Sequence, residues 1–171
     1  MDYEALERVL GHTFQDKALL ETALTHTSFA NEARHGTKHN ERLEFLGDSV
    51  LSIVVAEYLF THSSLPEGDL TRMRASLVCE AALFTFAQKI GLGRWLRLGH
   101  GEEMGGGRTR PSVVSDAFEA VIAALYLDGG IDAARAFILP FVTSALTKQS
   151  AEEDYKTKLQ EVIQRSSQVP L

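Results

Sequence analysis

Apolar residues recur every three or four positions along most of this chain, a spacing that places them on one face of a helix. The pattern predicts helices at residues 3–10, 19–24, 40–60, 70–90, 111–127 and 132–148. No window of strand length alternates convincingly between apolar and polar residues, and no segment is repeated. We therefore expect an all-α fold.

Glycine, proline and polar clusters mark the breaks between these helices. The glycines expected to end helices are Gly11, Gly91 and the pair at 129–130. The segments expected to be loops are residues 30–39, residues 63–68 and a flexible surface connection at 91–110. Pro140 is expected to kink the last helix. Cys79 falls on an apolar stripe, where a small core residue is expected rather than a nucleophile.

The helix at 40–60 has one apolar face and one acidic face. The apolar stripe contains Leu43, Leu46, Val50 and Leu51. The acidic stripe contains Glu41, Glu44 and Asp48. Like charges four positions apart destabilise an isolated helix by roughly 0.2–0.5 kcal/mol per pair, so we expect a cation over this face. Asn40 is a suitable N-cap residue for this helix.

A second acidic pair, Asp116 and Glu119, lies three positions apart on the helix at 111–127. If the two helices pack together, these side chains converge with Glu44 and Asp48, and each raises the pKa of the others unless a cation neutralises them. Oxygen ligands without His or Cys favour Mg²⁺, with Mn²⁺ as a substitute, over zinc. The reaction class that follows is phosphodiester hydrolysis. For either pair alone, a solvated acidic face is the alternative.

Length and composition limit the classes of protein to be considered. The chain has 171 residues, which suffices for one domain and a short appendage, and 44% hydrophobic and 23% charged residues are typical of globular proteins. No apolar run is long enough to span a membrane, and the acidic start does not resemble a signal peptide, so we expect a cytoplasmic protein. A net charge of −6 argues against a general nucleic-acid coat protein.

Four segments resemble motifs of the bacterial ribonuclease III family: residues 24–32, 40–51, 67–74 and 115–120. The resemblance implies an all-α, homodimeric nuclease fold. It also implies a Mg²⁺-dependent endonuclease that cuts both strands of double-stranded RNA in rRNA or mRNA processing. The products would carry 5′-phosphates and short 3′ overhangs. No organic cofactor and no membrane partner are expected.

The resemblance and the chemistry together assign roles to the acidic residues. Glu44, Asp116 and Glu119 are expected to bind metal directly, with Glu119 also counted as catalytic. Asp48 is expected to orient or deprotonate the attacking water and is a further metal ligand. The secondary metal-site candidates are Glu41 and Glu67. We expect His26 to be a hydrogen-bonded structural histidine and assign it no chemistry.

Contacts with a second chain and with RNA are also implied by the resemblance. Phe45 of the acidic-helix motif is expected to enter a pocket of the partner subunit. The candidate RNA contacts are Arg72, Arg74, Arg108, Thr157, Gln160 and Glu161. The last three lie where the chain resembles the first helix of a double-stranded RNA-binding domain.

The predicted organisation has three parts: a nuclease domain at 1–148, a linker at 149–154, and a truncated, poorly ordered first helix of an RNA-binding domain at 155–171. With few phosphate contacts outside the nuclease domain, we expect weak and strongly salt-sensitive cleavage. One alternative is a catalytically silent RNA-binding or ribosome-associated module with the same fold. Another is a metal-dependent phosphohydrolase that acts on small molecules.

Overall fold

The computed structural model describes residues 3–33 and 36–166, with side chains described as far as residue 152. These residues form helices α1 (Tyr3–Leu10), α2 (Lys17–Ala23), α3 (Thr27–Glu32), α4 (Glu41–His62), α5 (Glu67–Val78), α6 (Glu80–Lys89), η1 (Leu92–Trp95), α7 (His100–Met104), η2 (Gly107–Thr109) and α8 (Pro111–Ser166). Within this described part, the only β pairing is an isolated parallel bridge between Thr25 and Arg97. The prediction of an all-α fold is confirmed.

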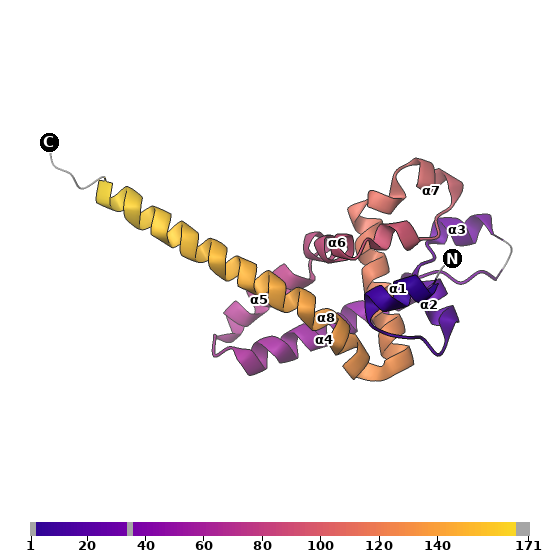
Figure 1. Cartoon of the computed structure of the whole chain (residues 1–171), viewed down its shortest axis with the longest axis horizontal. Helices are drawn as coiled ribbons and strands as arrows, with labels where there is room; N and C mark the ends of the chain where they lie inside the picture. Colours follow the sequence, from indigo (N-terminus) through magenta and orange to yellow (C-terminus); the bar gives the residue numbers. More distant parts are fainter. Residues whose placement is uncertain (1–2, 34–35, 167–171) are drawn as a thin grey trace.

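Helices α4 and α8 form the centre of the molecule (Figure 1). The first part of α8 is buried on most of its circumference, and its buried hydrophobic side chains are Val113, Val114, Ala117, Phe118 and those of residues 120–125. Helix α4 contributes Val50, Leu51, Val54, Val55 and Leu59 to the same core. Because hydrophobic burial is the main favourable term in folding, this packing fixes how the two acidic faces lie relative to each other.

Helix α8 consists of two helices that meet at Gly130. The dihedral angles of Gly130, φ 76° and ψ −175°, are accessible to glycine and not to other residues, which confirms the predicted end of a helix at 129–130. Helical geometry then continues through Pro140 to Ser166. The start of this second half is still packed in the core, through residues such as Phe137 and Ile138, and Figure 1 shows its C-terminal part leaving the body of the molecule. The backbone at 149–154, where we expected a linker, is part of the same helix.

The predicted helix at 70–90 is wrong in one respect, because it is two helices separated at Cys79. The ψ angle of Cys79 is 157°, which is extended rather than helical. Leu77 and Leu83 are both buried, although residues six positions apart point to different sides of a continuous helix. The break turns the chain so that both leucines face the core. Cys79 itself is exposed and is not the core residue that we expected.

Two details around the start of α4 also differ from the predictions. Residues 30–32, expected to be loop, belong to the short helix α3. Asn40 does not cap α4 with its side chain. Its Nδ2 atom donates to the carbonyl oxygen of Ala23 at 3.3 Å, and its backbone N–H donates to the oxygen of Thr25 at 2.9 Å. Asn40 therefore joins α4 to the segment that follows α2.

Residues 91–110 form an ordered structure with its own polar contacts, in contrast to the flexible connection that we predicted. The Nη1 atom of Arg108 donates to the carbonyl oxygens of Gly93 at 3.1 Å and Leu96 at 2.7 Å, and the guanidinium also pairs with Glu103. Arg110 forms an ion pair with Glu102. These contacts tie both 3₁₀ turns and α7 to one another.

The carboxylate of Asp128 fastens the N-terminal loop to α8. It accepts hydrogen bonds from the backbone N–H groups of Gln15 at 3.0 Å and Asp16 at 2.9 Å, and its Oδ2 atom lies 2.7 Å from Nε2 of His12. The side chain of Asp128 is only 3% exposed. This contact secures α1 and α2 close to the point where α8 changes direction at Gly130.

None of the helices in the described residues combines the length and the apolar character that crossing a membrane requires.

Candidate metal centre

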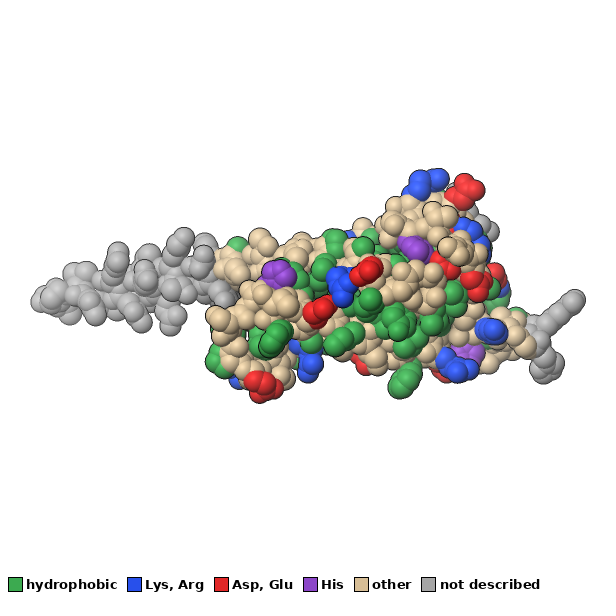
Figure 2. All heavy atoms as spheres, turned by 90° about the horizontal axis from the view of Figure 1, so that it is seen from below, with side chains coloured by type: hydrophobic (Ala, Val, Ile, Leu, Met, Phe, Trp, Pro, Cys, Tyr) green, Lys and Arg blue, Asp and Glu red, His purple; other side chains and the backbone are tan. Residues whose placement is uncertain are grey.

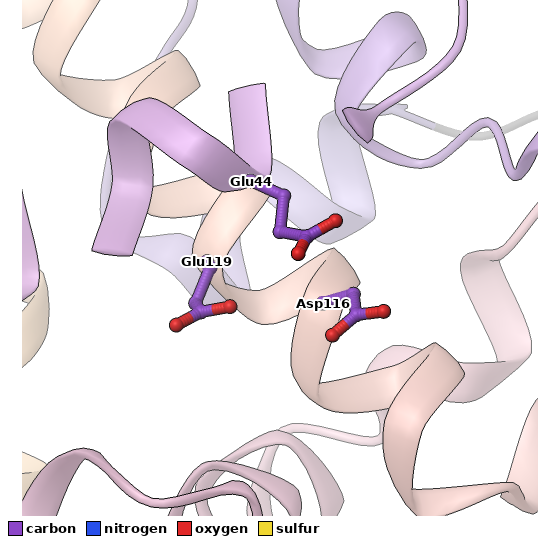
Figure 3. Close-up of side chains that lie close together, drawn as sticks. All are labelled: Glu44, Asp116 and Glu119. Carbon is purple, nitrogen blue, oxygen red and sulfur yellow. The ribbon is translucent and has the colours of Figure 1, made fainter. Parts of the chain in front are cut away.

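Three carboxylates from two helices meet at the contact between α4 and α8. Glu44 comes from the first turn of α4, and Asp116 and Glu119 come from neighbouring turns of α8. One oxygen atom from each lies within 4.8 Å of the others, and all three side chains are half-buried. Figure 3 shows them directed toward a common space. The structure therefore brings together three of the four predicted metal ligands.

Gly47 allows this arrangement because it lies directly against α8. A Cβ atom placed on Gly47 would lie 1.8 Å from the carbonyl oxygen of Glu119 and 2.5 Å from its carbonyl carbon. Any larger residue at this position would force the helix backbones apart. Glu44 is one turn before Gly47 on the same helix, so the close contact positions its carboxylate beside Glu119.

The electrostatics of the site favour a bound cation. Burial and then the charges of Asp48, Asp116 and Glu44 raise the pKa of Glu119 from its ordinary value of 4.5 to about 8. Burial and the charges of Asp116, Glu41 and Asp48 likewise raise the pKa of Glu44. Without a cation, Glu119 is therefore mostly protonated at neutral pH. A divalent ion removes this repulsion, and hard oxygen ligands suit such an ion.

The other predicted acidic residues lie around this cluster. Asp48 is exposed and is not one of the three converging carboxylates, although its charge acts on both Glu44 and Glu119. Glu41 is exposed, and its charge acts on Glu44. Glu67 is exposed at the start of α5, where it accepts a hydrogen bond from the hydroxyl of Thr71 at 2.8 Å. The structure does not place Glu67 with the three carboxylates.

Two further residues act on Asp116, and neither was assigned to the site from the sequence. Burial and the charge of Glu80 raise the pKa of Asp116, whereas His26 acts in the opposite direction. Glu80 is the first residue of α6, directly after the break at Cys79. We predicted one continuous helix through residue 90, which placed Glu80 in the middle of a helix. The prediction therefore gave no reason to assign Glu80 to the site.

Comparison with known proteins places the chain in a family. A family model described as Ribonuclease-III-like matches residues 16–146. A protein named Ribonuclease 3 from Caldanaerobacter subterraneus subsp. tengcongensis is 50% identical over 163 residues, which cover 93% of this chain and 72% of that protein. Another from Bdellovibrio bacteriovorus is 47% identical over 169 residues, covering 96% and 72%. The chain belongs to the ribonuclease III family.

Solved structures agree with this assignment. The nuclease domain of ribonuclease III from Campylobacter jejuni, a structure concerned with flexibility in a region involved in dimer formation, has a TM-score of 0.77 and 42% identity. The match covers 84% of this chain and 97% of that one. Dicer from Pichia stipitis has a TM-score of 0.58 and 30% identity, covering 82% and 59%. The predicted family and the predicted enzyme class, a ribonuclease III endonuclease, are confirmed.

The surface of this ribonuclease III chain exposes large hydrophobic side chains along α4. Phe45 is 79% exposed, and Ile53 and Phe60 are exposed on the same helix. Figure 2 shows one face of the molecule on which hydrophobic side chains gather. Monomeric proteins rarely leave such groups together in solvent, so an exposed apolar helix face favours contact with another surface.

The candidate RNA-contact residues differ in their exposure and in whether other groups of the protein already bind their side chains. Arg72 is exposed and pairs with Asp69, one turn earlier on α5. Arg74 is half-buried and lines a surface pocket together with Phe60 and Glu67. Arg108 is engaged by carbonyl groups of the 91–110 segment, as described above. The remaining three candidates, Thr157, Gln160 and Glu161, lie outside the residues whose side chains are described. All six stay predictions.

Proposed function

We propose that this protein is a Mg²⁺-dependent endoribonuclease, with Mn²⁺ as a possible substitute, that cleaves double-stranded RNA as a homodimer in the cytoplasm. Its role would be the processing of rRNA or mRNA, with products that carry 5′-phosphates and short 3′ overhangs. The observation that carries the proposal is the convergence of Glu44, Asp116 and Glu119 within 4.8 Å, in a chain of the ribonuclease III family.

The residues of the site have distinct tasks in this proposal. Glu44, Asp116 and Glu119 would hold the ion, which when bound supplies a water of lowered pKa and charge stabilisation for an in-line displacement. Glu119 must lose its proton when it becomes a ligand. Asp48 remains exposed one turn after Glu44, where it can orient the attacking water and accept its proton. Half-burial of the three ligands limits competition from bulk water.

The homodimer follows from the number of strands to be cut. One chain supplies one set of carboxylates, whereas cleavage of both strands of a duplex requires two sets. Phe45 is the proposed anchor, because its side chain is 79% exposed on α4, one residue after the ligand Glu44. A dimer interface there would bury this ring and would lie next to both sites. A-form RNA offers phosphates and 2′-hydroxyls more than readable bases, so selectivity for duplex form is expected.

The domain organisation also remains part of the proposal. We assign residues 1–148 to the nuclease domain, 149–154 to a linker and 155–171 to the first helix of a double-stranded RNA-binding domain. The family match at 16–146 supports the first boundary, since it ends close to residue 148.

Gel analysis of a defined RNA hairpin and a long duplex tests the function. We expect cleavage in Mg²⁺, none in EDTA, and a loss on the order of 10³-fold in Asp116→Ala and Glu119→Ala, because several kcal/mol of transition-state stabilisation depend on the ion. Asp132→Ala is the matched control, since this carboxylate on α8 is 91% exposed and pairs with Arg135. It should cleave as the wild type does.

Three outcomes would contradict the proposal in different ways. Near-wild-type cleavage by Asp116→Ala would exclude the carboxylate cluster as the active site. Binding of the duplex without cleavage in Mg²⁺ would indicate a silent RNA-binding module. Hydrolysis of a small phosphodiester that excess duplex RNA does not slow would indicate a phosphohydrolase of small molecules.

A further inference from the structure

A cavity opens at the surface between the C-terminal half of α4 and helix α5. Its volume is about 470 Å³, and its walls are mainly apolar. The side chains that matter for what it can hold are Ala56, Leu59 and Phe60 from α4 and Leu70, Thr71 and Arg74 from α5. An apolar cavity of about 150 Å³ is enough for a benzene ring, so this cavity can accept an aromatic side chain.

Arg74 brings a positive charge to this cavity that its own chain does not neutralise. The residue is half-buried, and within the described residues no carboxylate pairs with its guanidinium. The two carboxylates at the cavity are engaged elsewhere: Glu57 pairs with Arg135, and Glu67 accepts a hydrogen bond from the hydroxyl of Thr71 at 2.8 Å. Charges that are partly removed from water are generally paired, so the cavity favours a partner that carries negative charge.

One face of α4 connects Phe45 to this cavity. At 3.6 residues per turn, Phe45, Ser49, Ser52, Ala56 and Phe60 lie within about 80° of one another around the helix. The two rings at its ends are 79% and 77% exposed, and the residues between them are small. Small side chains let two helices approach closely, because the distance between helix axes depends on the side chains at the contact. This face is therefore suited to packing against another helix.

A second copy of α4 matches this face in an antiparallel arrangement. In a two-fold symmetric contact, residue i of one copy meets residue j of the other, and residue j meets residue i. A two-fold axis near Ser52 would be equally far along the helix from Phe45 and from the cavity at 56–60, each roughly 10 Å away at 1.5 Å per residue. The Phe45 ring of each copy would then lie over the cavity of the other.

The charges on the two sides of this contact are complementary. Glu41 lies one turn before Phe45 and Asp48 lies three residues after it, and both carboxylates are exposed. A Phe45 ring that enters the cavity therefore brings two negative charges close to the guanidinium of Arg74. A guanidinium can also lie favourably against the face of an aromatic ring. The cavity thus offers the entering turn of α4 both an apolar site and a cation.

We propose that the cavity between α4 and α5 binds the Phe45 ring of a second copy of this chain, with the two α4 helices antiparallel and Arg74 facing the acidic turn of that copy. The inference rests on the homodimer of the proposed function, and it adds which surface of one chain binds the other. Arg74 is then an interface residue rather than a contact to RNA. Because Phe45 directly follows Glu44, the cavity of each chain lies beside the carboxylate cluster of the other.

Complementation between two defective variants tests this assignment. Phe45→Ala removes the ring and leaves the cavity. Thr71→Trp fills the cavity from an exposed position on α5 and leaves the ring. A dimer of either variant alone has no intact contact, whereas a mixed dimer keeps one, between the ring of the Thr71→Trp chain and the cavity of the Phe45→Ala chain. Sedimentation equilibrium of each variant and of an equimolar mixture, without metal or RNA, measures association.

We expect each variant alone to associate at least about tenfold more weakly than the wild type, as for loss of a buried aromatic anchor. The mixture should associate at least about tenfold more tightly than either variant alone. Ala56→Leu, which fills the cavity from α4, should replace Thr71→Trp in this mixture with the same result. Melting temperatures equal to that of the wild type establish that each variant is folded.

Two controls accompany the mixture. Ser76→Trp adds the same side chain at an exposed position of α5 that does not line the cavity, and it should associate like the wild type. A chain that carries both Phe45→Ala and Thr71→Trp should gain nothing when mixed with Phe45→Ala, because no ring is left to enter a cavity. Wild-type association by Thr71→Trp, or a mixture no tighter than its components, overturns the proposal.

Arg74 is tested by reversing its charge. Arg74→Glu places a carboxylate opposite Glu41 and Asp48 of the second copy, so it should weaken association at least about tenfold, whereas Arg74→Lys should retain most of it. The loss should disappear when Phe45→Ala is present as well, because the acidic turn no longer enters the cavity. Arg74→Glu that associates like the wild type overturns the assignment of this residue to the interface.

The same measurements separate failure of this inference from failure of the proposed function. If the wild type stays monomeric at every concentration, the proposed homodimer itself fails. If the wild type forms a dimer but the mixture shows no gain over its components, only the cavity is wrongly assigned. Cleavage does not enter either comparison, since association is measured without metal and RNA.

Discussion

Gly47 of α4 lies directly against the backbone of Glu119 on α8, so that the position of a Cβ atom on Gly47 would be 1.8 Å from the Glu119 carbonyl oxygen. A Cβ atom cannot approach a backbone oxygen this closely. The glycine is therefore needed for the distance between the two helices that carry the carboxylates. It connects the packing of the core to the geometry of the candidate metal centre.

We expect Gly47→Ala to damage both stability and activity. Forcing one methyl group into this contact should lower the free energy of unfolding by about 1–3 kcal/mol. The displaced helices should reduce cleavage on the order of 10²-fold, because catalysis is sensitive to shifts of about 1 Å. Urea unfolding and duplex cleavage provide the measurements. Gly101→Ala is the control, because nothing lies within 4 Å of its Cβ position. Equal stability of the two variants would contradict the prediction.

The stability of the metal-free protein should fall as the pH rises. Glu119 has a pKa of about 8 in the folded protein, against an ordinary value of 4.5. Between these values the folded state retains a proton that the unfolded chain releases, so the free energy of unfolding decreases with increasing pH. The melting temperature in EDTA should fall across this window, and added Mg²⁺ should raise it more near pH 8 than near pH 4.5.

Glu119→Gln tests the origin of this pH dependence. The amide cannot titrate, so the variant should show a flatter pH dependence of the melting temperature and a higher melting temperature than wild type in EDTA near pH 8. It should also lose cleavage, since a proposed metal ligand is replaced by a neutral amide. A pH profile identical to that of the wild type would show that another group is responsible.

Phe45→Ala should weaken the proposed dimer while leaving the fold of each chain intact. The ring is 79% exposed and contributes little to the core of its own chain, so the unfolding free energy should change by less than about 0.5 kcal/mol in a monomer. Sedimentation equilibrium should show at least about tenfold weaker association, as expected for a buried aromatic anchor. Met104→Ala on α7, where the side chain is 76% exposed, should associate like the wild type.

Asp128→Ala should release the N-terminal loop from α8. It removes the acceptor for the N–H groups of Gln15 and Asp16 and the partner of His12, at an expected cost of about 1–3 kcal/mol in urea unfolding. Burial alone would raise the pKa of Asp128, but the Asp16 amide, His12 and the Gln15 amide hold it below 3.8. The difference from wild type should shrink as the pH falls below 3.8, where the wild type loses the same contacts.

The control for that substitution is Asp132→Ala, whose carboxylate is 91% exposed on the second half of α8. Surface changes of this kind usually alter stability by less than about 0.5 kcal/mol. If Asp132→Ala lowered the free energy of unfolding as much as Asp128→Ala does, the loss of stability would come from the charge on α8 rather than from the contact with the loop.

Sequence periodicity was sufficient to predict the helices that build the site. On α4, and again on the first half of α8, the apolar residues and the acidic residues lie on opposite faces of the helix. Burial of the apolar face therefore predicted where the acidic face of each helix would lie. The contact between these helices was not predictable in the same way. It depends on Gly47, a residue without a side chain, and on its distance from a backbone atom 72 positions later in the chain (47 to 119).

The errors have a related cause, because local patterns do not report contacts between distant segments. The apolar pattern on both sides of Cys79 suggested one helix, whereas packing of Leu77 and Leu83 required two. Asn40 is a residue type that often caps helices, yet its side chain donates a hydrogen bond to the carbonyl oxygen of Ala23. Arg108 looked like a mobile surface cation, and its hydrogen bonds to the carbonyl groups of Gly93 and Leu96 hold it in place instead.

The break between α5 and α6 also makes the protein suitable for spectroscopy. Cys79 is the only cysteine of the chain, and it is exposed one residue before Glu80. A nitroxide or fluorophore attached to this thiol gives one probe per chain without any substitution. In an assembly of two chains, the separation of the two probes would report how the chains are arranged, and its change on addition of RNA would show whether RNA alters that arrangement.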